Sequence, residues 1–517
     1  MKNFDQKAFI HAPLLLLLAA FGLITFLLFT FNSSFKNGLF SYLFPKPPSH
    51  AATAVDVTSQ LENLGNPFTA KPTYARNVWD MQNFNGKIYL GHGDFNSNAG
   101  PIDVFYYDPS SSTFLKQATS GNSCGSTCVD EEQLGIYHIF NNTLYTPGID
   151  PRGSVPAGNF YRIENGSLTK HNTISPLNLH TYDIYKFGTA LFAAGYGTNT
   201  SQGLAISTND GVSWTAPAYG NENTTDGGSS TYKGGANNFF EIGGKLYVAG
   251  TFYRQGQDTS GNWWQHFINI ARFDGGNLFT IVNWDAAKAM FPGFQGTSVV
   301  AGTPSLTITG NLILTRWVNF NNQLVYIGED SGVPKALFKA ATFGTGQVIT
   351  LPDNALPRDI LVSGGTVYVL ASTGSGSTYT NYVFSSTDLN TWDEVLHFGS
   401  DTFARSFEML NGDFYFGLGT DSTTSPSPST GNILRVKQAA YQPPPSPSAP
   451  ISEPITPSPT PTPGPKQGDI NGDNKVDIID LSVLLSNWLG TDTSSDINKD
   501  GKVGIIDLSI LLSNWLK

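Results

Sequence analysis

The sequence predicts a mainly β protein, a seven-bladed β-propeller followed by a small α-helical domain. Three observations predict this fold. Charged residues make up only 13 % of the 517 residues, and 54 glycines with 31 prolines favour short strands joined by tight turns. A turn-and-strand segment recurs seven times in the middle of the chain, and a loop-and-helix segment occurs twice at its end.

The N-terminal residues 1–35 contain a nearly continuous apolar run at 12–31, preceded by two lysines. About 20 apolar residues can span a bilayer, whereas the apolar part of a cleaved signal peptide has about 7–15. We therefore expect an uncleaved signal anchor, a single pass through the cell membrane that leaves the rest of the chain extracellular. Secretion after cleavage of a signal peptide is the alternative. Residues 36–58 are expected to be a linker.

Residues 59–440 hold the sevenfold repeat. Asn-Gly, Asn-Asn and Gly-Gly pairs supply the positive φ angles of two-residue hairpins. A third strand follows each segment and a fourth follows the first six, which predicts four-stranded blades; residues 66–73 are expected to supply the last strand and close the ring. A generic β-sandwich would not explain sevenfold recurrence. The segments are 84–91, 140–146, 187–193, 242–250, 320–326, 363–369 and 410–416.

Two turns inside the repeats, residues 207–214 and 385–392, resemble the Asp-box of sialidase-type and related propellers. In such a turn a short polar side chain caps backbone amides while a tryptophan packs between sheets. The resemblance implies a fold and no reaction. Cys124 and Cys128 are the only cysteines, and with a secretory N-terminus we expect them to form a loop disulfide. A zinc site that includes His138 is the alternative, although it lacks further ligands.

Candidate ligand-binding residues share one position in the repeat. If the strands of the repeats are in matching register, the guanidinium groups of three arginines would point into one cavity. They would then bind the carboxylate or sulfate of an acidic sugar. The alternative is that these groups form Arg–Asp pairs that join neighbouring inner strands. Ten residues before the central aromatic lie Arg316, Arg358 and Arg405, and nine residues before it lie Asp80, Asp183 and Asp359.

The sequence assigns no catalytic pair. Glycoside hydrolysis needs two carboxylates about 5–9 Å apart, and a sequence gives no distance. Trp263 and Trp264 form either an exposed platform for sugar stacking or part of the core of an expanded blade. The acids nearest the presumed channel are Glu131, Glu132, Asp183 and Glu408.

Residues 441–466 are rich in proline and predict a polyproline II spacer, on the order of 70 Å long at about 3.1 Å per residue. Residues 467–517 then contain two loops with oxygen ligands at calcium-binding positions 1, 3, 5, 9 and 12, and a backbone carbonyl at position 7. The first loop offers Asp469, Asn471, Asp473, Lys475, Asp477 and Asp480. The second offers Asp496, Asn498, Asp500, Lys502 and Asp507, with Gly504 at position 9.

Each loop leads into an apolar helical stripe, at 481–489 and 508–516. The duplicated loop and helix, with Asp at position 12, resemble the type I dockerin family. The resemblance implies that Ca²⁺ at two sites folds the domain and that one helix face binds a cohesin-type domain. The recognition pairs of the family fall on Ile478 and Ile479 and on Ile505 and Ile506, which implies an apolar contact.

The net charge of −11 and the lack of a basic run exclude a nucleic-acid-binding surface. The sequence therefore favours an extracellular, surface-anchored binding protein, with a dockerin for assembly and a propeller for a glycan or protein ligand. The alternative is a dockerin-borne glycan-active enzyme, a glycoside hydrolase or polysaccharide lyase.

Overall fold

A computed structural model of the chain divides into two compact units at Pro443. Residues 1–54 and 442–467, which include the predicted anchor, most of the first linker and the proline spacer, lie outside the described residues. No helix among the described residues is long and apolar enough to cross a membrane. The structure describes residues 55–152, 158–172, 174, 180–196, 203–222, 230–233, 235–257, 263–294, 312–330, 333–441, 468–471, 475–476, 478–488, 490 and 492–514.

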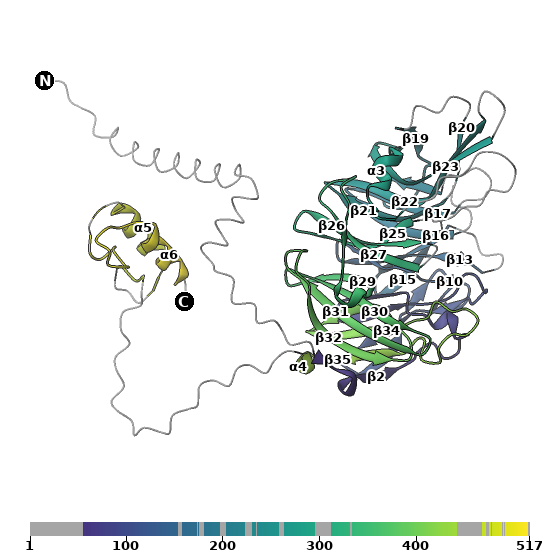
Figure 1. Ribbon diagram of the computed structural model, residues 1–517, viewed down its shortest axis with the longest axis horizontal. Helices are drawn as coiled ribbons and strands as arrows, with labels where there is room; N and C mark the ends of the chain where they lie inside the picture. The colour runs from purple at the N-terminus through teal and green to yellow at the C-terminus, as the bar shows by residue number, and fades with distance from the viewer. Residues whose placement is uncertain are drawn as a thin grey trace. The chain divides into compact units, whose positions relative to one another are not determined.

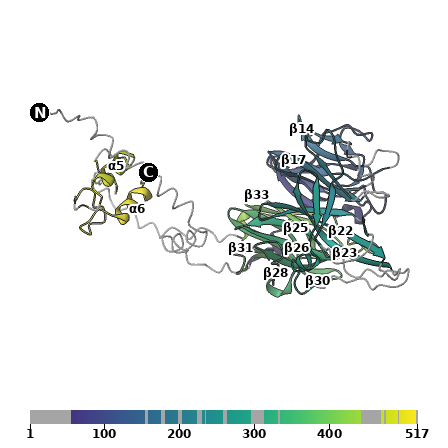
Figure 2. The same cartoon turned by 90° about the horizontal axis from the view of Figure 1, so that it is seen from above.

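The first unit is the predicted seven-bladed β-propeller (Figures 1 and 2). Blades 1 to 3 follow one another in the chain, each with its inner strand first. Blade 1 consists of β3 (Asp80–Phe84), β4 (Lys87–Gly91), β6 (Phe105–Asp108) and β7 (Thr113–Lys116). Blade 2 consists of β11 (His138–Phe140), β12 (Thr143–Pro147), β14 (Phe160–Glu164) and β15 (Ser167–His171), with β8 (Thr119–Ser120) outside; blade 3 has β16 (His180–Phe187), β17 (Ala190–Tyr196) and β18 (Leu204–Ser207).

Blades 4 to 7 complete the ring. Blade 4 consists of β21 (Ala236–Ile242), β22 (Lys245–Gln257), β23 (Trp263–Gly275) and β24 (Leu278–Ile281), with β19 (Ala218–Asn221) and β20 (Ser230–Lys233) added. Blade 5 consists of β25 (Leu312–Phe320), β26 (Gln323–Asp330), β27 (Val333–Ala340) and β28 (Gln347–Ile349). Blade 6 consists of β29 (Leu356–Ser363), β30 (Thr366–Ser375), β31 (Thr378–Ser386) and β32 (Asp393–Ser400); blade 7 has β33 (Ala404–Leu410), β34 (Asp413–Leu418) and β35 (Ile433–Val436).

The hairpins of the repeat form where the turn pairs predict them. In blade 1, Asn85 and Gly86 have φ angles of 52° and 73°, and Phe84 pairs with Lys87 across the turn. The core consists of seven buried clusters, one between each two neighbouring blades, such as Tyr89 of blade 1 with Leu144 of blade 2. Because each blade buries both faces against its neighbours, the strands carry aromatic and aliphatic side chains on both sides.

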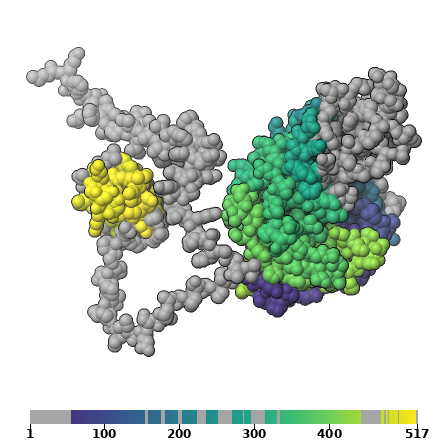
Figure 3. Space-filling model, in the orientation of Figure 1, coloured from purple at the N-terminus to yellow at the C-terminus, as the bar shows by residue number. Residues whose placement is uncertain are grey.

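An N-terminal strand closes the ring, although it is not the predicted one. The closing strand is β2 (Glu62–Gly65), which pairs antiparallel with β35, and not residues 66–73. Pro67 and Pro72 explain the difference, because proline has no N–H group for a ladder hydrogen bond. The propeller also begins ahead of the expected residue 59, since β1 (Val55–Asp56) pairs with β32. Figure 3 shows these purple residues at the surface beside the green residues of the last blade.

Other departures lie at blades 1 to 3. The segment between β7 and β11 supplies two further short strands, β9 (Cys128–Val129) and β10 (Glu131–Gln133). β9 pairs with β5 (Ile102–Asp103), which precedes β6, and β10 pairs with β13 (Ile149–Pro151), which follows β12. Cys124 and Cys128 form a disulfide there. Blade 3 has three strands within the described residues, and a single bridge from Ile206 to Thr215 stands where its fourth strand was expected.

The Asp-box-like turn of blade 3 holds that bridge in place. Ser207 Oγ accepts a hydrogen bond from the N–H of Gly211, and Trp214 donates to the carbonyl of Gly211. The buried Trp214 ring then packs on Phe160 of blade 2. In the second turn Ser386 caps Leu389 in the same way. The assignment of these turns to the Asp-box stays a prediction.

The second unit contains two helices, α5 (Ile478–Ser486) and α6 (Ile505–Ser513). Its core consists of Val476, Leu484, Val503 and Leu511, so each loop-and-helix copy supplies one valine and one leucine. The apolar stripes are only partly buried. Leu485 and Leu512 are exposed, at 44 % and 52 %, and so leave an apolar surface beside the core.

Candidate functional site

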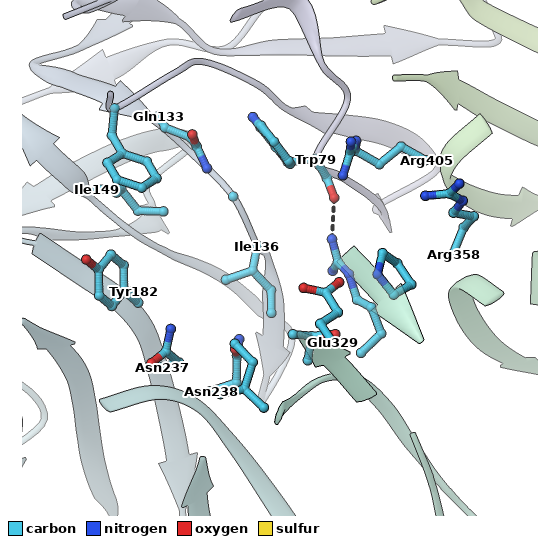
Figure 4. Close-up of a pocket in the computed structure, with 16 residues that line it drawn as sticks. Trp79, Gln133, Ile136, Ile149, Tyr182, Asn237, Asn238, Glu329, Arg358 and Arg405 are labelled. Carbon is cyan, nitrogen blue, oxygen red and sulfur yellow. Dashed lines mark hydrogen bonds between the residues drawn. The ribbon is translucent and has the colours of Figure 1, made fainter. Parts of the chain in front are cut away.

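A cavity of about 340 Å³ lies at one mouth of the central channel, where the inner strands begin. All seven blades contribute to its lining, because each inner strand enters the ring at the same level. Figure 4 shows arginines on one side and amide, aromatic and aliphatic side chains on the other. The lining includes Trp79, Phe95, Gln133, Gly135, Ile136, Ile149, Tyr182, Asn237, Asn238, Thr315, Arg316, Glu329, Arg358 and Arg405.

The three predicted arginines all line this cavity, but they do not act alike. Arg316 donates to Asp80 Oδ1 at 2.7 Å and to the carbonyl of Trp79, and its Nε lies 3.8 Å from Asp359 Oδ1. Its charge is thus neutralised within the channel by blades 1 and 6. The predicted alternative of Arg–Asp pairing between inner strands therefore describes Arg316.

Arg358 and Arg405 share one carboxylate, that of Asp421 in the loop after β34. Arg358 Nη1 lies 3.3 Å from Asp421 Oδ2, and Arg405 Nη2 lies 2.5 Å from Oδ1. Both guanidinium groups stack on the Phe403 ring, at 3.6 and 5.1 Å from its centroid, and Arg405 also stacks on Trp79. Of the three arginines predicted to form a clamp, Arg358 and Arg405 therefore remain side by side at the cavity, on one carboxylate and one aromatic ring.

The opposite wall is neutral. Tyr182, Asn237 and Asn238 from blades 3 and 4 face the arginines across the cavity, with Gln133 and Ile149 above blade 2 (Figure 4). Amide and hydroxyl groups beside aromatic rings match the edges and faces of a sugar ring. The cavity is thus cationic on one side and suited to hydroxyl groups on the other.

Glu329, from the second strand of blade 5, is the one acidic residue among the described lining residues. Burial raises its pKa, and the nearby Arg405 and Arg316 oppose this rise. The described lining residues therefore include a single carboxyl group, and the other carboxylate at this mouth, that of Asp421, is paired with Arg358 and Arg405.

Glu329 was not predicted, and the acids that were predicted on the inner strands join neighbouring blades instead. Asp80 accepts from the N–H of Tyr137, Asp183 from Phe239, Asp359 from Phe407 and Glu408 from Asn83. Each of these bonds links a carboxylate on one inner strand to the backbone of the next inner strand. Asp183 also contacts His138 at 2.7 Å, which ties this histidine into the inner strands rather than to the cysteines.

A second cavity of about 410 Å³ lies further along the channel, and Arg316 lines both. Asp359 and Glu408 line it, and burial raises the pKa of each to about 7. Arg316 opposes this rise at Asp359, whereas the charge of Asp80 adds to it at both groups. Both acids also accept backbone hydrogen bonds that join neighbouring inner strands.

Glu131 and Glu132 lie in the added strand β10 and line neither cavity. Glu131 is fully buried and accepts from Asn159 and the Tyr161 hydroxyl at 2.6 and 2.9 Å. Burial raises the pKa of each glutamate to about 7. The backbone of Trp263 and Trp264 begins β23, and the platform hypothesis concerns side chains that lie outside the described residues.

The repeat position that holds the three arginines also identifies lining residues of the cavity in the other four blades. Counting ten residues before the central aromatic in the other repeats gives Trp79, Gly135, Tyr182 and Asn237, all of which line the cavity. Glu329 lies on a second strand and Asp421 on a loop, so no repeat position marks either residue.

The calcium loops place oxygen donors inward where the structure describes them. In the second loop the buried Asp507 accepts from the N–H groups of Asn498 and Gly504, at 3.0 and 2.7 Å, and Asp496 accepts from Asp500 and Gly501. Burial tends to raise the pKa of Asp507, but these backbone donors outweigh it and lower the pKa. The carboxylate is therefore ionised, as a calcium ligand must be.

The first loop repeats this arrangement, because Asp480 accepts from the N–H groups of Ile470 and Asn471. Asp473 and Asp477 lie outside the described residues. Within the described part of the chain, no three His, Cys, Asp or Glu side chains already converge as a cation cage. The donor set is nevertheless all oxygen, from Asp, Asn and backbone carbonyl groups, and it fits calcium in kind.

Comparison with known families identifies the C-terminal unit. Residues 467–514 match the dockerin type I domain, which confirms the resemblance. Type I dockerin domains generally bind calcium, and dockerin domains bind cohesin partners. No curated protein matches the chain.

Several solved structures resemble the propeller weakly, each with a TM-score below 0.5. The computationally designed Ika8 protein is 8 % identical, with a TM-score of 0.37, over 73 % of this chain and 99 % of its own. An ulvan lyase of polysaccharide lyase family PL25 is 11 % identical, with a TM-score of 0.38, over 75 % and 96 %. The GH74 xyloglucanase from Xanthomonas campestris is 10 % identical, with a TM-score of 0.41, over 74 % and 54 %. Similarity at this level does not extend to activity.

Proposed function

We propose that a chain ending in a type I dockerin domain and carrying this channel mouth is an extracellular binding component of a protein assembly. The dockerin binds calcium and a cohesin domain, and the propeller binds an acidic glycan. The observation that carries the second half is the buried pair Arg358 and Arg405 opposite a neutral wall of Tyr182, Asn237 and Asn238. A guanidinium pair suits a carboxylate or sulfate, and amide and aromatic groups suit a sugar ring.

A glycan array with the full chain tests the propeller. We expect binding to uronate-containing or sulfated oligosaccharides over neutral ones of equal length. Arg405→Ala should weaken that binding about 10- to 100-fold, since a hydrogen bond to a charged group is worth about 1.5–3 kcal/mol. The matched control is Arg272→Ala, which removes an arginine paired with Asp274 and Glu222 on blade 4. Equal binding of neutral and acidic glycans would contradict the proposal, as would binding only to a protein ligand.

Two unequal calcium sites are proposed for the dockerin. The first loop offers four carboxylates and the second offers three, because Asp477 corresponds to Gly504 in the second loop. A higher ligand charge favours tighter calcium binding, so the first site should be the tighter. Calcium titration of Asp477→Gly should show a weaker first site. An unchanged affinity would overturn this ranking.

The apolar recognition faces support cohesin binding in two orientations. Ile505 and Ile506 are 70 % and 54 % exposed, and Ile479 is 52 % exposed, while the Ile478 side chain lies outside the described residues. Changing one isoleucine pair to aspartate should leave binding to a type I cohesin panel, and changing both pairs should abolish it. Loss of binding after a single change would favour one fixed orientation.

A glycan-active enzyme is the second candidate, and Glu329 favours it. Its raised pKa suits a general acid, and it lies in the same cavity as the arginines. Hydrolysis lacks a second carboxylate among the described lining residues, so a lyase is the closer alternative. A screen for hydrolysis and elimination on acidic polysaccharides decides between the candidates. Turnover that Glu329→Gln abolishes, with binding retained, would favour the enzyme.

The N-terminal segment is proposed to anchor the chain in the cell membrane with both units outside. Secretion after cleavage is the alternative, and it would give the dockerin its usual role of carrying a soluble protein to a scaffold. N-terminal sequencing of the mature protein distinguishes the two. An intact segment 1–35 in the membrane fraction supports the anchor.

A further inference from the structure

We infer that Asp421 is a tethered competitor for the ligand site, so that an acidic sugar binds the Arg358–Arg405 pair by displacing this carboxylate. The inference rests on the proposed glycan function and assigns Asp421 a role in specificity. It follows from the way in which one carboxylate is divided between two guanidinium groups of neighbouring blades.

The two arginines are buried and held by several contacts, whereas Asp421 is exposed and can move. The side chains of Arg358 and Arg405 are only 7 % and 12 % exposed, and the Phe403 ring supports both. Arg405 is also held by Asn77 Oδ1, and Arg358 by Ser372 Oγ at 3.0 Å. Asp421, by contrast, is 37 % exposed and is joined to these blades by its contacts with the two arginines. The arginines would therefore keep their positions when the carboxylate leaves.

The charges require an anion between the two arginines. Burial lowers the pKa of Arg358, and the charge of Arg405 lowers it further, while Asp421 opposes both. Two buried cations thus form ion pairs with one carboxylate, that of Asp421, although Glu329 also lies near Arg405. A ligand carboxylate or sulfate could take the place of Asp421 with the same chemistry. Because Asp421 is already partly hydrated, its transfer to water costs less than the transfer of a buried carboxylate.

The loop that carries Asp421 is held on both sides of it. Thr420 donates its N–H to Asn77 Oδ1 at 2.7 Å. Further along, the hydroxyl groups of Ser427 and Ser429 donate to Asp401 Oδ2, at 2.8 and 2.9 Å. The serine contacts do not involve the arginines, whereas Arg405 also donates to Asn77 Oδ1 and to the carbonyl of Thr420, so the backbone beside Asp421 stays attached to this fixed arginine. A swing of the Asp421 side chain therefore opens the anion site without unfolding the loop.

Calorimetry on the full chain with D-glucuronate, sulfate and neutral D-glucose tests the inference. If Asp421 occupies the arginines about nine-tenths of the time, Asp421→Asn should bind glucuronate about tenfold more tightly, because the competent fraction rises to one. Without ligand the variant should unfold at a lower temperature, since the two arginines lose their anion. Glucuronate or sulfate should raise this temperature more than in the unchanged protein.

Asp401→Asn is the matched control. It removes a carboxylate that anchors the same loop and leaves the arginines untouched, so it should not tighten binding. Equal or weaker anion binding by Asp421→Asn would show that Asp421 positions the arginines, and would overturn the inference. Tighter binding of free sulfate by Asp421→Asn, with no binding of glucuronate and no binding of any acidic oligosaccharide on the glycan array, would uphold the displacement of Asp421 and defeat the glycan proposal. Binding of no anion by either protein would overturn both.

Discussion

Charge at single residues of this propeller is used mainly to hold strands together. Asp80, Asp183, Asp359 and Glu408 each accept an N–H from the next inner strand. A charge-assisted hydrogen bond is stronger than a neutral one, so four such links stiffen the ring around its channel. An acid in this register is therefore a structural signal. Among the described residues that line the channel-mouth cavity, Glu329 is the one acid, and it lies outside the register.

Glu131 provides a test of buried charge at the residue scale. Its folded-state pKa is raised from 4.5 to about 7 by burial, while Tyr161, Asn159 and Lys170 lower it in part. The folded state therefore keeps a proton that the unfolded state releases above pH 4.5, so stability falls as the pH rises from about 4.5 to 7 and then levels off. The loss is about 3 kcal/mol at most, at 1.36 kcal/mol per pH unit.

Glu131→Gln should reduce this pH dependence by the share that Glu131 contributes, because an amide keeps an acceptor oxygen for Asn159 and Tyr161 but does not titrate. Glu132, Asp359 and Glu408, whose pKa burial also raises to about 7, keep their own contributions. Urea unfolding at pH 5, 6 and 7 measures the slope. Glu164→Gln, at a more exposed acid of blade 2, is the control and should leave the slope in place. A slope unchanged in Glu131→Gln would mean that another group carries it.

At the scale of elements, local patterns were sufficient for the hairpins and insufficient for the pairings between distant segments. Turn pairs such as Asn85–Gly86 fix a hairpin within a few residues, so the sequence predicts it. The added pair β10 and β13 depends on contacts that no local pattern encodes. The residues of the channel mouth could be predicted from the sequence in part. Its repeat register predicted the arginines and would have predicted Trp79 and Tyr182, whereas Asp421 comes from an irregular loop.

The strand β2 gives a prediction at this scale. A chain that starts at residue 55 keeps the closing strand, whereas one that starts at residue 67 lacks β1 and β2 and exposes the edges of β32 and β35. Exposed edges pair with other chains, so the shorter chain should unfold at a lower temperature and aggregate. Calorimetry and light scattering compare the two. Equal behaviour would show that six blades and three strands of the seventh are sufficient.

On the scale of the whole molecule, the two units are separate compact bodies with separate cores. Calcium is expected to stabilise only the dockerin, because its ligands all lie within residues 469–507. Chelation by EDTA should abolish the unfolding transition of the dockerin and leave that of the propeller unchanged. Calorimetry of the full chain with calcium or with EDTA measures both transitions at once. A shift of the propeller transition would reveal a metal in that unit.

The closure of the ring also determines how the propeller responds to mechanical load. Glu62 at the start of β2 lies opposite Arg435 near the end of β35, so the chain enters and leaves this strand pair at the same end. If the proposed N-terminal anchor and the cohesin contact both hold, tension between them would first release β1 from β32 and then separate β2 from β35 one hydrogen bond at a time. Glu62 forms ion pairs with both Arg435 and Lys437 at that end. These ion pairs hold together the end of the β2–β35 pair at which the separation of these two strands would begin.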